Sequence, residues 1–476
     1  MNKKADFPGI LDFIWYLFLI LLPLTSVPVV VRLVHSDVVA APSALLLPIL
    51  LVGILIPVIK EKKAFPENLI PLILFVIAAL ASTAISFFYQ LPDYKGTNPF
   101  RASFSAVLTL FVGFSFYLVT LLYLKDEKRI NTTFKLLNIS GAVVLIWTLA
   151  QAVCWYKYQR YPEWMKNIQF TLSIGSLYRQ RFVGFTLEPS WLAHQLNLLY
   201  LPLWFAASVT GHTVFRLRFK FITIERCLFA IGILVLFLTL SRVGLAAFLM
   251  TAAFAAAIFV HRLIQNASKK FPLKHKKLVT LSAYAGILLA AAAIAFGIVF
   301  LLTKLDFRMA GLFDIRAKGR SDPVFYIADK LSLAARFVYW DGGLSIFDRY
   351  PLFGVGLGHA GLYLPQLMND YAFRLVEVRR LLFRSNTLLN IKSLWIRILA
   401  ETGIVGFAFF FIWYLRSFFT NAIRLTHSNK MIRTAAWMGC FALIAFIFEG
   451  FSLDTFALPY IWFSAALAAA AGEIKS

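Results

Sequence analysis

Residues 278–302 read LVTLSAYAGILLAAAAIAFGIVFLL and contain no charged side chain. An apolar run of about 20 residues is long enough to cross the hydrocarbon core of a bilayer as a helix. The chain has many such runs, is 60% hydrophobic over 476 residues and has a mean hydropathy of +0.76. Only helices or closed barrels can span lipid. Because the runs are too long for barrel strands, the sequence predicts an all-α, polytopic membrane bundle.

About twelve membrane spans are expected from these runs. The N-terminal run follows a basic start, is longer than the apolar core of a signal peptide and has no convincing cleavage site after it, so it is expected to be the first span. The predicted spans are 11–33, 38–59, 68–89, 103–124, 134–155, 184–209, 222–240, 242–260, 278–302, 393–415, 433–450 and 454–472.

Lysine and arginine are concentrated in every second connection between these spans. The residues are Lys60, Lys62, Lys63, Lys125, Lys128, Arg129, Arg216, Arg218, Lys220, Arg262, Lys269, Lys270, Lys274, Lys276, Lys277, Arg416, Arg424, Lys430 and Arg433. Short cytoplasmic loops carry such an excess of cations. The pattern therefore predicts that both termini are cytoplasmic. The expected organisation is a bundle over 1–302, a large outer loop over 303–392 and C-terminal spans over 393–476.

The formal net charge of +24 restricts the class of partner. Such an excess suits nucleic acid, anionic lipid or an anionic substrate, and no DNA- or RNA-binding motif accompanies it. The outer segment 156–183 is basic where the topological bias disfavours cations; its charged residues are Lys157, Arg160, Lys166, Arg179, Arg181 and Glu163. This placement favours an anionic ligand, with anionic lipid headgroups as the alternative. Its aromatic side chains, Tyr156, Tyr158, Tyr161, Trp164 and Tyr178, could stack on sugar rings or form an interfacial belt.

Two ionisable residues lie near the outer ends of predicted spans. Arg242, in LTLSRVGLAAFLM, is a functional candidate because a charge there is costly; the alternative is an arginine that extends to lipid headgroups. Glu188, in RFVGFTLEPSWLAHQLN, is expected to be desolvated, which suits general-base work. Glu188 could equally form a structural ion pair with Arg181 or Arg242. His194 is expected to be a hydrogen-bonded packing residue.

Residues 331–361 read LSLAARFVYWDGGLSIFDRYPLFGVGLGHAG. Apolar side chains recur at helical spacing, at Leu333, Phe337, Trp340, Leu344 and Phe347. This helix is expected to lie on the membrane surface or to dock on the bundle, with Arg336 and Tyr339 on a neighbouring face. Pro351 is expected to end it. The glycines that follow allow close approach of the backbone to a neighbour.

This stretch resembles the large outer loop of the O-antigen ligase and O-antigen polymerase superfamily, bacterial enzymes that join lipid-linked glycans at the outer face of the inner membrane. The matching residues are Ser241, Arg242, Arg336, Trp340, Pro351, Leu352, Gly354, Gly356, Gly358, Glu401, Gly403 and Gly406. The resemblance implies a fold like that of GT-C-type membrane glycosyltransferases. It also implies catalytic roles for Arg242 and Arg336, and substrate binding by Arg181 and the glycine turn.

One position departs from the ligase pattern. The ligases carry a histidine linked to catalysis at the start of the helix that holds Glu401, and here that place holds Lys392. A protonated lysine can bind phosphate but is not a base. The departure favours a polymerase or a divergent glycan transferase, in which Glu188 takes the role of the histidine. His359, directly after the glycine turn, is the spare candidate.

The function implied by the resemblance is attack by a sugar hydroxyl on the anomeric carbon of a second glycan carried on polyprenyl pyrophosphate. A polysaccharide polymerase is favoured, with a ligase that moves the glycan to a lipid or protein acceptor as the nearest alternative. A transporter or flippase of lipid-linked glycans is the alternative from another class. No carboxylate cluster indicates a required metal, and no cofactor is expected. Membrane lipid and other polysaccharide-assembly proteins are the remaining expected partners.

Overall fold

The structure, a computed structural model, describes residues 9–34, 41–60, 66–216, 218–219, 222–270, 275–306, 309, 327–328, 333–385 and 387–474. Its elements are α1 (Ile10–Leu21), α2 (Pro28–Val34), α3 (Pro42–Lys60), η1 (Glu67–Leu69), α4 (Ile70–Ser86), α5 (Pro99–Tyr123), α6 (Glu127–Tyr158), α7 (Glu163–Leu172), α8 (Pro189–Gln195), η2 (Leu196–Tyr200), α9 (Leu201–Thr210), β1 (Arg218–Phe219), β2 (Ile222–Thr223), α10 (Ile224–Leu238), α11 (Arg242–Lys270), α12 (Lys276–Leu305), α14 (Ala334–Arg349), α15 (Ala360–Leu367), η5 (Asp370–Arg374), α16 (Val376–Arg384), α17 (Leu394–Arg424), α18 (Lys430–Glu449) and α19 (Tyr460–Glu473). Apart from the short antiparallel pair β1–β2, these elements are helices, which confirms the all-α class.

Within the described residues, eight helices are long and apolar enough to cross a membrane. They are η1–α4, α3, α5, α6, α11, α12, α17 and α18. The chain is therefore an integral membrane protein. The expected count of about twelve spans is not confirmed by this measure, because the segments 11–33, 184–209, 222–240 and 454–472 form shorter helices.

Prolines and a π-helical turn shorten most of these segments. The first is divided because α1 ends before Pro23 and α2 begins at Pro28. Pro189 starts α8, and the π-helical turn η2 separates α8 from α9 along one continuous apolar run. Pro459 precedes the first residue of α19. Proline is tolerated in the first turn of a helix but removes a backbone donor further in, so these positions mark helix boundaries.

The connections predicted to be cytoplasmic meet one another at one end of the bundle, called the basic end here. Ion pairs join Asp12 to Arg129 over 3.4 Å and Glu67 to Arg416 over 2.9 Å. Further contacts there pair Asn131 with His212, Thr210 with Thr434, and Arg262 with Trp437. These contacts place on one side of the molecule the connections that the charge pattern in the sequence had grouped together.

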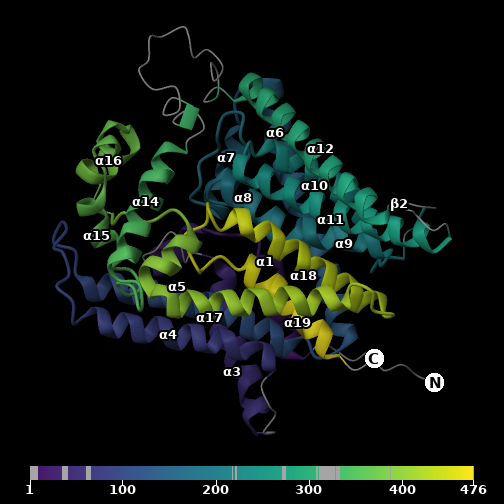
Figure 1. Ribbon diagram of the computed structural model, residues 1–476, viewed down its shortest axis with the longest axis horizontal. Coiled ribbons are helices and arrows are strands. Elements are labelled where there is room, and N and C mark those ends of the chain that lie inside the picture. The colour runs from purple at the N-terminus through teal and green to yellow at the C-terminus, as the bar shows by residue number, and fades with distance from the viewer. Residues whose placement is uncertain are drawn as a thin grey trace.

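The other connections meet at the opposite end, called the loop end, where α14, α15 and α16 lie together (Figure 1). The Oγ atoms of Ser26 and Ser173 are 3.1 Å apart. Further contacts there are made by Lys95 with the carbonyl of Leu381, and by Arg181 with the carbonyl of Thr239. Most of residues 303–332, the first part of the expected outer loop, lie outside the described residues.

The centre of the bundle is formed by α18 and α19. Residues Tyr460–Ala471 are buried throughout, as expected for a helix that is apolar on all sides. Around this centre, α4 and α17 lie side by side, with the rings of Phe75 and Phe410 5.1 Å apart (Figure 1). By contrast, α12 packs on α11 at the edge and is mostly exposed, which suits contact with lipid.

The predicted helix before Pro351 is present as α14 and belongs to a second hydrophobic core. That core includes Val338, Tyr339, Ile346, Leu364, Val378 and Ile391. Phe337 and Leu344 of the predicted apolar face are each 44% exposed. Tyr339 is fully buried. The buried side of α14 therefore includes part of the face expected to carry Arg336 and Tyr339, and is not only the predicted apolar face. The glycines at 342 and 343 let α14 approach Leu364 and Ile396 closely.

Candidate active site at the loop end

The glycine turn after α14 is hydrogen-bonded to a break in α17. Gly403 has φ 63° and ψ −167°, so the helix is interrupted there. The interruption releases two carbonyl groups from helical bonding. Ala400 O accepts from the amide of Val355 over 3.0 Å, and Glu401 O accepts from the amide of Gly356 over 2.9 Å. Two of the sequence motifs that carry the resemblance therefore form a single backbone-paired unit.

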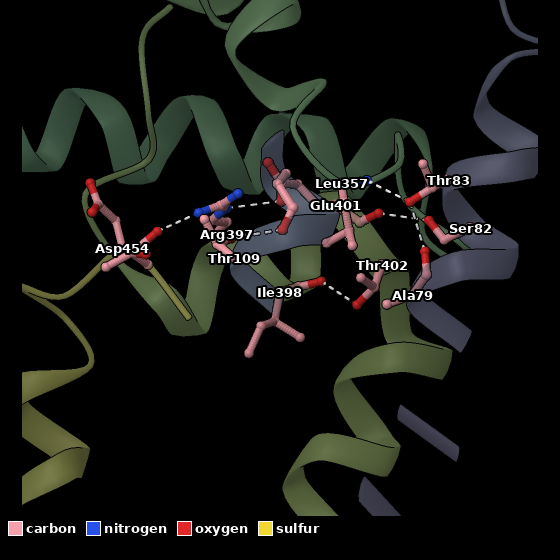
Figure 2. Close-up of polar contacts among 12 residues, drawn as sticks. Ala79, Ser82, Thr83, Thr109, Leu357, Arg397, Ile398, Glu401, Thr402 and Asp454 are labelled. Carbon is pink, nitrogen blue, oxygen red and sulfur yellow. Dashed lines mark hydrogen bonds and ion pairs between the residues drawn. The ribbon is translucent and has the colours of Figure 1, made fainter. Parts of the chain in front are cut away.

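Side chains of α4 fix the same unit from the other side, as Figure 2 shows. Ser82 Oγ donates to the carbonyl of Glu401 over 2.7 Å. The amide of Leu357 donates to Thr83 Oγ1 over 3.1 Å. Sequence reasoning did not identify these α4 hydroxyls, and their only sequence signal is a pair of polar residues within an apolar span.

Each glycine of the turn has a left-handed backbone and no space for a side chain. The φ angles of Gly354, Gly356 and Gly358 are +67°, +84° and +83°. A Cβ at Gly354 would lie 2.6 Å from Ala400 O, and one at Gly358 would lie 2.5 Å from Ala102 O. Glycine is thus required for the close packing of the turn against α5 and α17. Direct binding of substrate by these glycines stays a prediction.

His359 is fully buried directly after the turn. Its Nε2 lies 2.7 Å from Ser103 Oγ, and its Nδ1 lies 3.0 Å from Ser86 Oγ. Both ring nitrogens are therefore used to join the turn to α4 and α5. This geometry favours a packing role for His359 over the spare catalytic role considered from the sequence.

A small cavity of about 260 Å³ lies between the turn, α5 and α17. Arg397, Glu401 and Asp454 line it. Arg397 Nε donates to Glu401 Oε2 over 2.9 Å, and Nη1 of the same guanidinium donates to the carbonyl of Asp454 (Figure 2). Sequence reasoning identified Glu401 but missed Arg397, although an arginine and a glutamate four residues apart in an apolar helix are a recognisable pair.

Arg336 lies on α14 at the surface between α14 and the end of α18. Its Nη1 donates to the carbonyl of Phe451 over 3.4 Å. Partial burial lowers the pKa of the Arg336 guanidinium, and the carboxylates of Asp454, Glu377, Glu188 and Glu449 raise it. Glu188, another predicted catalytic residue, is thus one of the carboxylates that affect the pKa of Arg336.

Glu188 occupies the N-cap position of α8 without a side-chain capping hydrogen bond and is exposed. Its Oε2 accepts from Ser190 Oγ over 3.2 Å. The expected desolvation is wrong, because α8 begins only at Pro189 and leaves the carboxylate outside the helix. Burial raises the pKa of the neighbouring Tyr178 phenol, Glu188 raises it further and Arg181 lowers it. Glu188, Tyr178 and Arg181 thus lie close to one another.

Arg181 and Lys392, the remaining predicted substrate contacts, lie on loop-end connections. Arg181 Nε donates to the carbonyl of Thr239 over 3.3 Å, and its guanidinium lies 6.0 Å from the centre of the Tyr178 ring. Lys392 is half-buried, has φ 58° and directly precedes Ser393, the N-cap of α17. It is thus at the start of the helix that carries Arg397.

Arg242 is the first residue of α11, and its Nη2 lies 3.6 Å from Oδ2 of Asp306 at the end of α12. An apolar groove of about 330 Å³ runs from Arg242 between these two helices. Its lining is almost entirely aliphatic and includes Leu249, Ala253 and Ala291. The groove therefore combines an arginine, paired with Asp306, at one end with a surface suited to a hydrocarbon chain.

A buried polar network connects α8, α11 and α18 beside this groove. Glu449 is fully buried, pairs with Nδ1 of His194 and accepts from Asn197 Nδ2 over 2.6 Å. Asn197 also donates to the carbonyl of Gly244 over 2.8 Å. His194 is therefore buried and paired with a carboxylate, whereas the expected hydrogen bonding stays a prediction. Its partner Glu449 was not anticipated.

Residues 227–411 match the family model described as O-antigen ligase. This part of the chain is similar to an O-antigen ligase domain. This domain extends from α10 into α17 and includes Arg242, Arg336, the glycine turn and Lys392, whereas Glu188 precedes it. The resemblance seen in the sequence is confirmed, and the domain indicates a ligase- or polymerase-type function in polysaccharide assembly. A comparison with curated proteins found no match.

Proposed function

We propose that this protein is a polysaccharide polymerase that joins polyprenyl-pyrophosphate-linked oligosaccharides at the outer face of the bacterial inner membrane. The observation that carries the proposal is the placement of two arginines around the end of α18. Phe448 lines the aliphatic groove together with Arg242, and Phe451, three residues later, accepts a hydrogen bond from Arg336. A hydrocarbon chain in the groove would bring its phosphate end to these cations.

The groove follows α11 from Arg242 to Ala253. With a rise of about 1.5 Å per residue, this is a contact length of about 16 Å along the helix axis. A prenyl chain is entirely apolar, so it is stabilised by the aliphatic lining in the same way as by lipid. The pyrophosphate would then lie at the loop end, where Arg242 and Arg336 can bind its oxygens with the forked geometry of guanidinium groups.

In the proposed reaction, a hydroxyl oxygen of the acceptor glycan forms a bond to the anomeric carbon of the donor glycan. The bond between that carbon and the pyrophosphate oxygen breaks, and the lipid pyrophosphate leaves with the electron pair. Arg242 and Arg336 stabilise the negative charge that develops on the leaving group. Glu188 accepts the hydroxyl proton. These side chains supply the charge stabilisation without a required metal.

A ligase function is the second candidate, because the matched family model is described as O-antigen ligase. Lys392 at the place of the ligase histidine favours the polymerase. Lys392→Ala is accordingly expected to weaken substrate binding more than turnover. The distinguishing experiment is chain-length analysis of the lipid-linked glycan in a deletion strain. A polymerase mutant keeps single repeats on the carrier, whereas accumulated long chains would establish the ligase instead.

We also propose twelve crossings, with the basic end in the cytoplasm and the loop end outside, in an arrangement like that of GT-C-type glycosyltransferases. Connections at the basic end contact one another, and connections at the loop end contact one another. These separate contacts support a chain that crosses the membrane alternately from one end to the other. The excess of lysine and arginine at the basic end supports the orientation. In this orientation the three-part division into a bundle, a loop over 303–392 and C-terminal spans places the cations of the site on the outer face.

A further inference from the structure

A large cleft separate from the arginine site lies where α6 ends and α7 begins. Its volume is about 1540 Å³, and Leu177, Arg179 and Gln180 complete its wall. Pockets for drug-sized ligands measure about 300–1,000 Å³. The cleft is therefore large enough for several linked sugar rings.

The lining of this cleft is positively charged. All its lining residues are described, and Glu163 is the only acidic one among them. Glu163 is already paired with Lys166 over 2.6 Å. Lys157, Arg160 and Arg179 line the same cleft and are exposed. The cleft thus presents cations to an entering ligand and favours an anionic one.

Aromatic rings form both the floor and the rim of the cleft. Trp155 and Tyr161 are buried with ring centroids 5.5 Å apart, and Tyr161 is fixed by donating to the carbonyl of Tyr178 over 2.7 Å. At the rim, Tyr158 and Trp164 are 53% and 54% exposed. Exposed rings on a rigid base provide flat apolar faces of the kind on which sugar rings stack.

The chemistry of the lining favours a glycan over a lipid headgroup. A bound lipid also needs an apolar slot for its acyl chains, as the groove beside Arg242 provides. In the cleft the only aliphatic side chains other than proline are those of Val153 and Leu177. The combination of cations and rings instead matches a sugar chain that carries carboxylate or phosphate groups.

We propose that the α6–α7 cleft binds an acidic oligosaccharide and holds the anionic glycan portion of the substrate while its lipid-linked end reacts near Arg336. This inference rests on the proposed function and adds the class of glycan to it. Arg160 and Arg179 bind the acidic groups, and Trp164 stacks on a sugar ring.

Binding to the purified full-length protein in nanodiscs of phosphatidylcholine tests this proposal. The probe is tetragalacturonate, and the matched neutral probe is its methyl ester. We expect the wild-type protein to bind the acidic probe at least tenfold more tightly than the ester. Arg160→Gln/Arg179→Gln is expected to weaken binding of the acidic probe at least tenfold, while Trp164→Ala weakens binding of both probes. The control Lys128→Gln/Lys277→Gln removes the same charge from exposed positions at the basic end and should leave binding unchanged.

Equal affinity for the acidic and neutral probes would overturn the proposal, as would equal losses in the two double variants. If anionic lipid in the nanodisc abolished binding of the acidic probe, the cleft would be a lipid site, and this result would also overturn the proposal. Arg336→Ala is expected to retain binding of the acidic probe, because the cleft is separate from the arginine site. An active polymerase that fails to bind the acidic probe would therefore refute this inference and leave the proposed function intact.

Discussion

The amide of Gly356 donates a 2.9 Å hydrogen bond to the carbonyl oxygen of Glu401. This bond joins the turn after α14 to the interrupted part of α17, although the two are 45 positions apart in the numbering of the chain. On the far side of the interruption, the amide of Ile404 donates to the carbonyl of Pro351 over 2.8 Å. The break at Gly403 thus replaces helical bonds with bonds to the turn, and the turn carries α14 and Arg336 with it.

Gly403→Ala is expected to destabilise the protein by at least about 2 kcal/mol, because a left-handed backbone and a steric clash act together. The added Cβ would lie 2.3 Å from the carbonyl oxygen of Leu352. Gly96→Ala is the matched control, since Gly96 has φ +61° and no atom within 4 Å of the added Cβ. The measurement is the midpoint of thermal unfolding in detergent. Similar decreases for both variants would show that packing against the turn contributes little.

Arg336→Ala is expected to abolish polymer formation at a normal protein level, and Arg336→Lys to be strongly impaired. Lysine keeps the positive charge but loses the two-point contact that a guanidinium makes with phosphate oxygens. Arg242→Ala is expected to behave like Arg336→Ala. Arg380→Ala serves as the control because it removes an exposed cation at the same end of the molecule. Polymer length is measured in cells; full-length polymer with either alanine variant would contradict the assignment.

Glu188→Gln is expected to reduce the rate by about 10²–10⁴-fold, the usual contribution of a general base. The side chain is exposed at the start of α8, so the substitution should leave the unfolding temperature unchanged. Glu127→Gln, at the exposed basic end, is the control. A normal rate for purified Glu188→Gln would rule out the role, and an unfolded variant would indicate a structural ion pair instead.

Glu401→Gln is expected to destabilise the protein by about 3–5 kcal/mol, because it leaves the Arg397 guanidinium partly buried without its charge partner. The side chains of Arg397 and Glu401 are only 14% and 4% exposed. The double variant Arg397→Leu/Glu401→Leu should recover part of that loss, because neither charge then remains buried. Unfolding is followed by denaturation in detergent. A single variant as stable as the wild type would show that the pair is not important for the fold.

The proposed orientation predicts that a cysteine at position 370 reacts with an impermeant reagent added outside intact cells. The background requires Cys154, Cys227 and Cys440 to be replaced by serine, since Cys227 is exposed. Asp370→Cys lies on the loop end, and Lys277→Cys on the basic end is the paired control; both positions are exposed. Labelling of position 277 alone in intact cells would reverse the orientation.

The sequence by itself determined the membrane class, eight of the spans and the grouping of the basic connections. These features depend on local composition, because a long apolar run must form a helix in lipid and charges remain where the chain leaves it. The helix before Pro351 and the glycine turn were also predictable, since proline and glycine restrict the backbone locally. The family resemblance then identified Arg242 and Arg336 as candidates.

Only the tertiary structure decided which residues lie together. The pairing of His194 with Glu449, the partner of Arg397 and the groove beside Arg242 depend on contacts between segments far apart in the chain. Glu188 is exposed because α8 begins only at Pro189. Hydropathy alone had placed Glu188 inside a helix. Burial and proximity are properties of packing, and a single sequence records apolar periodicity but not which helices it brings into contact.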